Sequence, residues 1–319
     1  MSIARATDRL ILMSRYLFKR FSAAIPTLFI IITAAFFLIH AAPGGPFDQE
    51  QSLAPQIVAN LDATFGLNQP LSVQYVRYMV ALAHGDFGPS FKYKDYSVTE
   101  LIVQGLPVTF TLGSIAMLVA LSFGVLMGVF AALRHNTAAD QVTMLLAVIG
   151  IAVPSFVLLP FMGLVFGIYL HWLPVAGWES GSITHLILPV IALALPPMSA
   201  IARLTRGSML EILRTPYVRT AIAKGLPWHL VIFRHALKPA LVPVVGFLAP
   251  AVASILTGSL VVESVAGLPG IGRYLVQGAL NRDYTLVLGM VILYSTVLIL
   301  MGLVVDLLYA WLDPRVRLG

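Results

Sequence analysis

The chain has 319 residues, of which 59% are hydrophobic and 11% are charged, and its mean hydropathy is +0.90. Water-soluble domains average about 25% charged residues, so this composition excludes a soluble globular protein. The absence of cysteine excludes disulfides, thiolate metal sites and a cysteine nucleophile. The formal charge of +6 does not require nucleic acid as a partner, because basic cytoplasmic loops explain it in a membrane protein.

Six apolar stretches are long enough to cross a bilayer, which takes about 20 residues of helix. They cover residues 22–42, 108–133, 142–170, 186–202, 240–262 and 285–310. The fourth stretch is the shortest and weakest, and prolines interrupt the third, fourth and fifth. Proline is tolerated in membrane helices because neighbouring groups satisfy the carbonyls that it frees. We therefore predict an all-α, polytopic membrane protein with six transmembrane helices.

The N-terminal region has basic residues before an apolar run, as a secretory signal does. The run is long enough to span a membrane and no strong cleavage site follows it, so we expect an uncleaved first span. Residues 1–21 are predicted to form a cytoplasmic N-terminal segment, and residues 22–319 the membrane domain.

The basic residues indicate the orientation of the chain. With six spans, 15 of the 20 Lys and Arg residues fall on one side of the membrane and 5 on the other. The positive-inside rule places the basic side, and with it both termini, in the cytoplasm. The long segment at about residues 43–107 is then external, and the basic segment at about residues 203–239 is cytoplasmic.

The sequence does not contain the common motifs of nucleotide-binding, metal-dependent or serine enzymes. It lacks the GxxxxGK[ST] phosphate loop, the HExxH metal motif and the GxSxG nucleophile motif. Its seven histidines are scattered, so no metal site is predicted. Ionisable residues are scarce at membrane depth, where a proton-driven transporter normally carries one. We therefore expect the energy source to lie in a partner that docks in the cytoplasm.

Glycines indicate two further local features. Gly124 and Gly128 form a GxxxG pattern, which favours close packing between membrane helices. The sequence GLPGIG at residues 267–272 resembles a nucleotide loop only superficially, because no soluble strand precedes it. We predict a tight re-entrant turn there.

The stretch YVRTAIAKGLPWHLVIFRHALKP, residues 217–239, is the least membrane-like part of the chain. It has four Lys or Arg residues, two histidines and no acid. Good helix formers precede Gly225, which can end a helix, and Pro227 is tolerated in the first turn of a second helix. From the residues alone, two interpretations remain open. One is an amphipathic helix held on anionic lipid, and the other is a helix-turn-helix that docks on a cytoplasmic motor.

This stretch resembles the EAA loop of bacterial ABC-importer permeases, the cytoplasmic element that docks on their ATPase subunits. Ala221 and Gly225 match the second alanine and the glycine of that motif, whereas Arg219 replaces its glutamate and Thr220 its first alanine. The same departure is typical of the peptide and nickel permease branch, whose version resembles RTARAKG. Further stretches follow in the order of that branch: HAAPGGPF, FGLNQPLSVQY, LPVTFTLG, RHALKPALVP and VDLLYAWLDPRVR. The stretch HGDFGPSFKYKDYSV is most similar to the B-type permeases of oligopeptide importers.

The resemblance implies the type I permease fold and a role as one of two membrane subunits that enclose a peptide path. Its implied partners are a homologous C-type permease, two ABC ATPase subunits that bind ATP and Mg, an external peptide-binding protein, the peptide substrate and the lipid bilayer. The chain itself would hold no cofactor, would not be an enzyme and would lie in the bacterial inner membrane. The residues implied in ATPase coupling are Tyr217, Arg219, Ala221, Lys224, Gly225 and Leu226.

The segment ESVAGLPGIGRYLVQGALNRDY, residues 263–284, is expected on the external side. It is too apolar for a free loop and too rich in glycine and proline for a span. We predict that it dips into the membrane and then forms a short helix at about residues 271–279, in an external gate near the binding protein. The residues assigned to this gate are Gly267, Pro269, Gly270, Arg273 and Asp283, with Arg273, Arg282 and Asp283 on the wet side. The alternative is a passive turn that joins two spans.

Other assignments remain open on the sequence. Within the same class, the substrate could be a dipeptide, an opine, glutathione or nickel. A self-contained secondary transporter would need a coupling-ion site, and a membrane-embedded protease would need paired acids, Ser and His, or a metal centre. The stretch MSRYLFKR at Met13 resembles the usual start of the family, so residues 1–12 are expected to be a mobile or surface-lying extension.

Overall fold

The computed structural model describes residues 2–42, 44–47, 55–179 and 182–312. These residues are mainly helical, and the one β-type pairing among them is an isolated bridge between Pro89 and Ser97. The long helices are α1 (Ser2–Ala41), α4 (Val98–Leu133), α7 (Thr184–Leu213), α11 (Val242–Ala266) and α13 (Tyr284–Leu312). Shorter helices are α2 (Pro55–Phe65), α3 (Leu71–Ala83), α5 (Ala138–Ala152), α6 (Ser155–Met162), η1 (Gly163–Tyr169), α8 (Pro216–Ala223), α9 (Trp228–Leu230), η2 (Val231–Ala236), α10 (Leu237–Ala240) and α12 (Ile271–Leu280).

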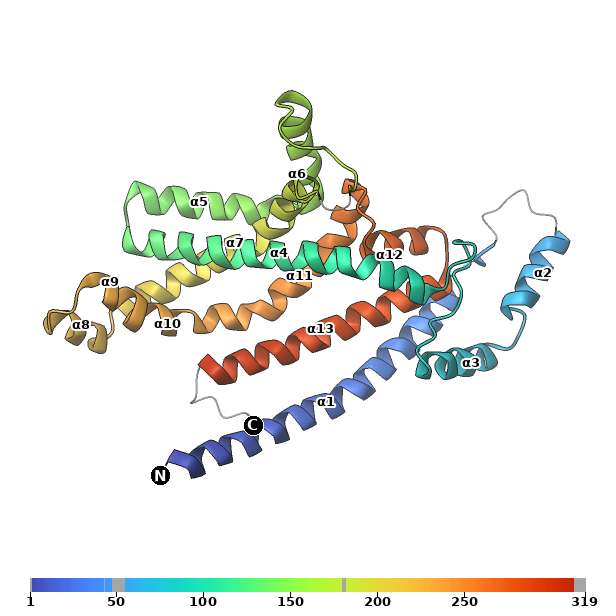
Figure 1. Ribbon diagram of the computed structural model, residues 1–319, viewed down its shortest axis with the longest axis horizontal. Coiled ribbons are helices and arrows are strands. Elements are labelled where there is room, and N and C mark those ends of the chain that lie inside the picture. Colours follow the sequence, from blue (N-terminus) through green and yellow to red (C-terminus); the bar gives the residue numbers. More distant parts are fainter. Residues whose placement is uncertain (1, 43, 48–54, 180–181, 313–319) are drawn as a thin grey trace.

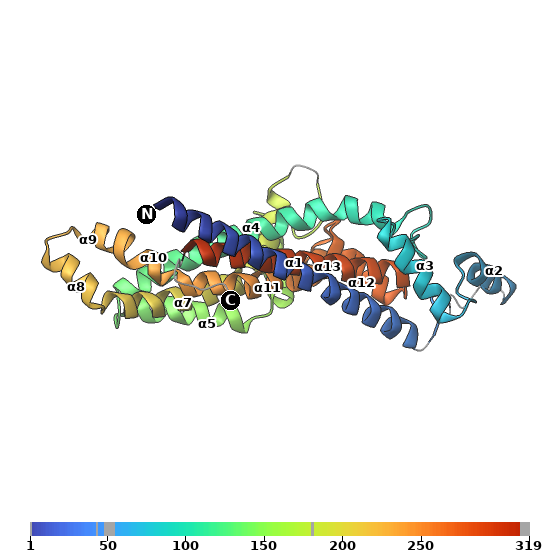
Figure 2. The same ribbon diagram turned by 90° about the horizontal axis from the view of Figure 1, so that it is seen from below.

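The molecule is elongated along its long helices, with α5 beside α4 and α6 projecting near the middle (Figure 1). Helices α8, α9 and α10 form one end, whereas α2, α3 and α12 lie toward the other. A view turned by 90° shows the same separation (Figure 2). Each end thus carries a distinct set of loops, as expected for a protein whose two ends face different compartments.

Five of the described helices are long and apolar enough to cross a membrane: Phe18–Ala41 of α1, then α4, α7, α11 and Tyr284–Leu308 of α13. They correspond, within two residues at their ends, to five of the six predicted spans, apart from the earlier starts of α1 and α4 and the longer ends of α7 and α11. Helix α1 runs without a break across residue 21, where the N-terminal segment was expected to end. Helix α4 begins ten residues before its predicted span. Its first turn carries a capping box between Ser97 and Glu100, which satisfies two backbone N–H groups.

The third predicted span is not one continuous helix, which corrects the sequence-based expectation. Helix α5 ends at Ala152, and the run of α6 and η1 leaves it at an angle of 104°. Val153 is extended, with φ −92° and ψ 116°, because the ring of Pro154 disfavours helical backbone at the residue before it. The pair can still count as one broken passage, which gives six passages in all.

Helix α7, the weakest of the predicted spans, is the most deeply buried. In its most apolar window, 61% of the residues are buried, against 17–33% in the other four long helices. It remains one 30-residue helix although it contains Pro189, Pro196 and Pro197. Because protein rather than lipid surrounds it, this helix does not need a strongly apolar surface.

The GxxxG pattern brings α4 against α7, as predicted. A Cβ atom at Gly124 would lie 2.7 Å from the backbone oxygen of Met198, and one at Gly128 would lie 2.5 Å from the backbone oxygen of Ala202. Both distances are too short for a side chain, so the two glycines allow the backbones to approach closely. This contact fixes α4 along the central helix.

Candidate coupling surface and external loop

The predicted helix-turn-helix is present as a small folded unit at one end of the molecule (Figure 1). Its first helix, α8, starts with Pro216 at the first helical position, where a missing N–H costs nothing. Val218 and Ala221 point inward and form a small apolar core with Val231 of η2. Ile212 and Leu213, at the end of α7, pack against this core, so α8 is anchored to the central helix.

The turn after α8 depends on Gly225. Its φ is +77°, a left-handed value that glycine adopts without strain, and a Cβ there would have no atom within 4 Å. The residue is therefore needed for its backbone angle and not to make space. Its N–H donates to the carbonyl of Ile222 at 2.9 Å, and the extended backbone of Pro227 then starts the second arm.

The second arm consists of α9, η2 and α10 in unbroken succession, and it leads directly into α11. Ile232, Ala236 and Ala240 are buried against Ala132 at the end of α4 and Met209 of α7. The hydroxyl of Tyr217 donates to the carbonyl of His235 at 3.3 Å and joins the two arms. The unit is thus packed on the ends of α4 and α7 and is continuous with α11.

The outer surface of this coupling unit is exposed and combines apolar and basic side chains. Every residue from 222 to 230 is exposed. Phe233 is 68% exposed and Trp228 50%, so large apolar side chains lie among the cations of this surface. Within the described residues, the exposed cations pair with no acid: Arg214, Arg219, Lys224, Arg234 and Lys238.

Five of the six predicted coupling residues lie on this surface: Tyr217, Arg219, Lys224, Gly225 and Leu226 are exposed. Ala221 is only 6% exposed and belongs to the core of the unit. Its small side chain lets α8 approach η2, so its role is in packing.

A buried ion pair beside the unit was missed at the sequence level. Arg206 of α7 donates to both carboxylate oxygens of Asp140 in α5, at 2.6 and 2.7 Å. Asp140 is 2% exposed, and it also accepts the backbone N–H of Asn136. The partners are 66 residues apart, so no local pattern signals the contact. It ties the start of α5 to α7, about three turns before the coupling unit begins at Pro216.

At the opposite end, the predicted short helix is present as α12, and a tight turn precedes it. Helix α11 ends at Gly267 with a φ of +69°, and Leu268 turns inward and is fully buried. Gly270 caps α12, and the N–H of Ile271 donates to the hydroxyl of Thr109 in α4 at 2.9 Å. The turn is therefore held by protein contacts and not by the chain alone.

Glu263 organises this turn, a role that its position near the end of a predicted span did not reveal. It is fully buried, and its Oε2 accepts the N–H of Gly272 at 2.8 Å. A Cβ at Gly270 would meet this carboxylate and would lie 2.6 Å from Thr109 Oγ1. The carboxyl group thus fills the space that the glycine leaves, beside the first turn of α12.

The expectation that Asp283 lies on the wet side is wrong. Its side chain is fully buried and accepts hydrogen bonds from the Ser90 hydroxyl and from the backbone N–H groups of Phe91 and Lys92. The loop before α4 requires a buried acceptor because three consecutive residues turn their donors inward. Arg273 and Arg282 are partly exposed, and so are Gly267 and Pro269.

Comparisons with known proteins all point to the same family of membrane transport proteins. The family model described as "Binding-protein-dependent transport system inner membrane component" matches residues 124–318, and the corresponding N-terminal model matches residues 13–113. The chain is 51% identical to the oligopeptide transport system permease protein OppB of Escherichia coli K12, over 96% of this chain and all of that one. It is 49% identical to OppB of Haemophilus influenzae over the same shares, and 44% identical to the dipeptide transport system permease protein DppB of Bacillus subtilis, over 96% of this chain and 99% of that one.

One solved structure supports the fold. It is that of the MetNI methionine ABC transporter in an inward-facing conformation, with a TM-score of 0.51 and 20% sequence identity. The match covers 67% of this chain and 96% of that one. At this identity the likeness shows the type I ABC-importer permease fold and nothing about the substrate.

Proposed function

The chain belongs to the family of binding-protein-dependent transport permeases, and from this premise we propose that it is the B-type membrane subunit of an ATP-driven oligopeptide importer. It is a transport subunit and not an enzyme. ATP and Mg bind to separate ATPase subunits, which power the transport. The chain lines half of the path that the peptide takes through the inner membrane.

Oligopeptides are the favoured substrate class because relatives named for oligopeptide transport share 49–51% of their residues with this chain, against 38–44% for relatives named for dipeptide transport. Dipeptides are the second candidate. The scarcity of charged side chains at membrane depth suits peptides of varied sequence, because no single side chain is held tightly.

The coupling unit is the single observation that supports the mechanism most strongly. It is an apolar and basic surface that projects at one end, packed on the ends of α4 and α7 and continuous with α11. We propose that the ATPases hold this surface and that their closure on ATP tilts the attached helices toward an outward-open arrangement. A homologous C-type permease completes the path, and both termini lie in the cytoplasm.

The external loop is proposed to form part of the gate at the other end, near the docked peptide-binding protein. Gly267 and Gly270 shape the turn, and Pro269 and Arg273 are partly exposed beside it. Asp283 contributes from the inside, by holding the loop before α4. A passive turn remains the competing interpretation, and a crosslinker on Arg273 that captures neither the partner permease nor the binding protein would favour it.

Replacement of Gly225 tests the coupling role. Gly225→Val puts a branched side chain at a left-handed φ and should distort the turn, whereas Gly225→Asn tolerates that backbone better. We expect the valine variant to lose most peptide-stimulated ATP hydrolysis and uptake while the permease remains in the membrane. Gly85→Val is a matched control, because Gly85 has a φ of +78°, equally open surroundings and a place at the other end. Normal uptake by Gly225→Val would refute the coupling role.

A further inference from the structure

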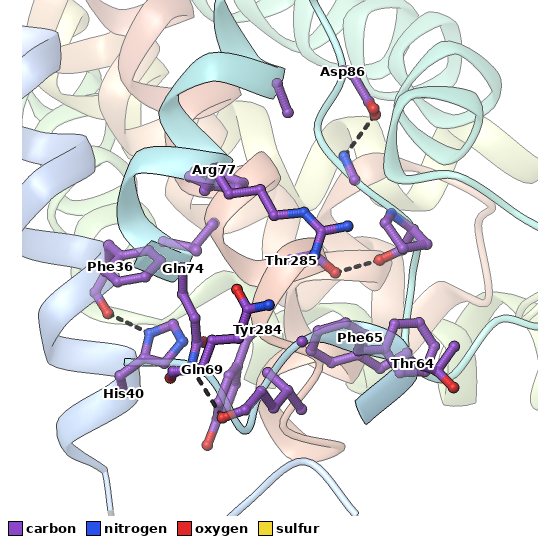
Figure 3. A pocket seen from close by; sticks show the side chains of 18 residues that line it. Phe36, His40, Thr64, Phe65, Gln69, Gln74, Arg77, Asp86, Tyr284 and Thr285 are labelled. Carbon is purple, nitrogen blue, oxygen red and sulfur yellow. Dashed lines mark hydrogen bonds between the residues drawn. The ribbon is translucent and has the colours of Figure 1, made fainter. Parts of the chain in front are cut away.

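A pocket of about 200 Å³ lies at the end of the fold opposite the coupling unit, between α1, α2, α3 and the start of α13 (Figure 3). Aromatic rings form much of its wall, and polar side chains enter it from several elements. The coupling unit contributes no residue to it, and the external loop segment at residues 263–284 contributes only its last residue, Tyr284. Its chemistry therefore needs a separate explanation.

Arg77 supplies the permanent positive charge of the pocket. Its side chain extends from α3 across the pocket toward Thr285 of α13 (Figure 3). Gly66, at a φ of +70°, leaves room for it, because a Cβ there would lie 3.0 Å from Arg77 Nη1. The arginine is exposed, and it pairs with no acid among the residues that the structure describes. A guanidinium in this setting is suited to a phosphate or a carboxylate.

Two other ionisable side chains line the pocket. His40 Nδ1 lies 2.8 Å from the carbonyl of Phe36, so this nitrogen donates a hydrogen bond and Nε2 is left for a ligand. Asp86 is the one acid among the described lining residues, and one of its oxygens accepts the N–H of Gly88. The pocket thus presents opposite charges at different points of its wall, which matches a ligand that carries both.

The surfaces beside the pocket are apolar and have no protein partner in the described chain. Val73, Val76 and Val80 of α3 are 46–59% exposed and share one helix face with Arg77. Residues on the opposite face, such as Tyr78, pack against α1 and α13. Helix α1 exposes Leu38 just before the pocket, and only 17% of its apolar window is buried. A helix with an apolar face and an arginine is typical of a bilayer interface.

We propose that this pocket binds the headgroup of a membrane phospholipid that carries a phosphate and an amine, such as a phosphoethanolamine lipid. The phosphate lies on Arg77, the ammonium group lies by Asp86, and the acyl chains run along α1 and the valine face of α3. Arginine stems also pack on apolar surface while the guanidinium stays polar, which suits this position. A lipid bound there would hold the outer end of α1 against α3 and α13.

Photocrosslinking to the whole importer complex in detergent tests the proposal. The probe is a phosphatidylethanolamine with a photoreactive group beside its headgroup, and mass spectrometry locates the labelled peptides. We expect labelling of residues 71–91 to fall about tenfold in Arg77→Gln and to recover partly in Arg77→Lys. Lys94→Gln is the matched control, because Lys94 is an exposed cation outside the pocket, and it should label as wild type does.

Competition identifies the source of the phosphate and the role of Asp86. Unlabelled phosphatidylethanolamine should displace the probe, and phosphatidylglycerol should do so less well. Asp86→Asn should remove this difference between the two lipids. Unchanged labelling in Arg77→Gln, equal displacement by both lipids, or displacement by inorganic phosphate or a short peptide at the same concentration would overturn the proposal. The readout is lipid capture, so failure here leaves the peptide-import role untouched.

Discussion

Two buried carboxyl groups in this molecule accept hydrogen bonds from the backbone N–H groups of turns. Glu263 accepts the N–H of Gly272, and Asp283 accepts those of Phe91 and Lys92. The hydroxyls of Thr109 and Ser90 accept further N–H groups of the same turns. A buried backbone donor without a partner costs free energy comparable to a lost hydrogen bond, so a carboxylate at such a point stabilises a specific turn geometry. Acids near the ends of membrane spans therefore need not face water.

Glu263→Ala should destabilise the external loop. The change leaves the N–H of Gly272 without its acceptor and opens a void against Gly270, at an expected cost of about 1–3 kcal/mol. Glu263→Gln keeps an acceptor oxygen and should cost less. Thermal unfolding of the purified complex, together with hydrogen exchange in residues 268–275, measures the effect. Wild-type stability and exchange in the alanine variant would show that the contact is dispensable.

Asp283→Ala should free the loop before α4. It removes the acceptor for the Ser90 hydroxyl and for the N–H groups of Phe91 and Lys92. We expect faster hydrogen exchange at residues 88–97 and a lower unfolding temperature. Asp86→Ala is a useful comparison, because Asp86 is exposed and accepts a single N–H, from Gly88, in the same loop. Equal effects of the two changes would contradict the special role of Asp283.

At the scale of single helices, glycine and proline positions in the sequence predicted the turns and helix starts that depend on neighbouring residues alone. The turn at Gly267 and the start of α12 follow from glycine and proline placement, and the structure has both. The arms of the coupling unit follow from the helix formers before Gly225, from Gly225 itself and from Pro227 in the same way. Each element forms where its own residues favour the required backbone angles.

Features that depend on distant partners could not be predicted in this way. The hydropathy of the sequence made α7 look like the weakest span, because this helix is surrounded by other helices and needs a less apolar surface. It also predicted one span over α5 and α6, because apolar residues continue on both sides of Pro154. The ion pair between Arg206 and Asp140 joins residues 66 positions apart. These contacts are set by the packing of whole helices, which no window of sequence contains.

The ion pair between α5 and α7 should matter for coupling. Arg206→Met removes both guanidinium hydrogen bonds to Asp140, which keeps the Asn136 N–H and His135 at 3.6 Å, so we expect a cost of about 1–3 kcal/mol. We expect lower thermal stability and weaker peptide-stimulated ATP hydrolysis, because the helix that carries the coupling unit loses its tie to α5. Arg203→Met is the matched control, since Arg203 lies one turn away on α7 and is exposed. A double change, Arg206→Met with Asp140→Leu, should recover part of the stability. If Arg206→Met and Arg203→Met behave alike, the ion pair has no special role.

At the scale of the whole molecule, the course of the chain favours six passages over five. Helix α4 ends toward the end that carries the coupling unit, and α7 ends there too (Figure 1). A chain that leaves α4 at this end must cross to the other side before α7 can return. The bent pair of α5 with α6 and η1 is the segment available for that crossing.

Cysteine labelling tests this course directly, because the chain contains no cysteine of its own. Single cysteines at Lys92, Glu179 and Lys224 sample the loop before α4, the loop after η1 and the coupling unit. An impermeant maleimide added to cells whose outer membrane has been permeabilised should label the first two, and Lys224→Cys only after the inner membrane is opened.

The unmodified chain, which has no cysteine, is the negative control for labelling. Six passages require Lys92→Cys and Glu179→Cys to label from the same side. If Glu179→Cys labels only after the inner membrane is opened, while Lys92→Cys and Lys224→Cys label before it, the bent pair is a re-entrant loop and the chain makes five crossings, with its termini on opposite sides.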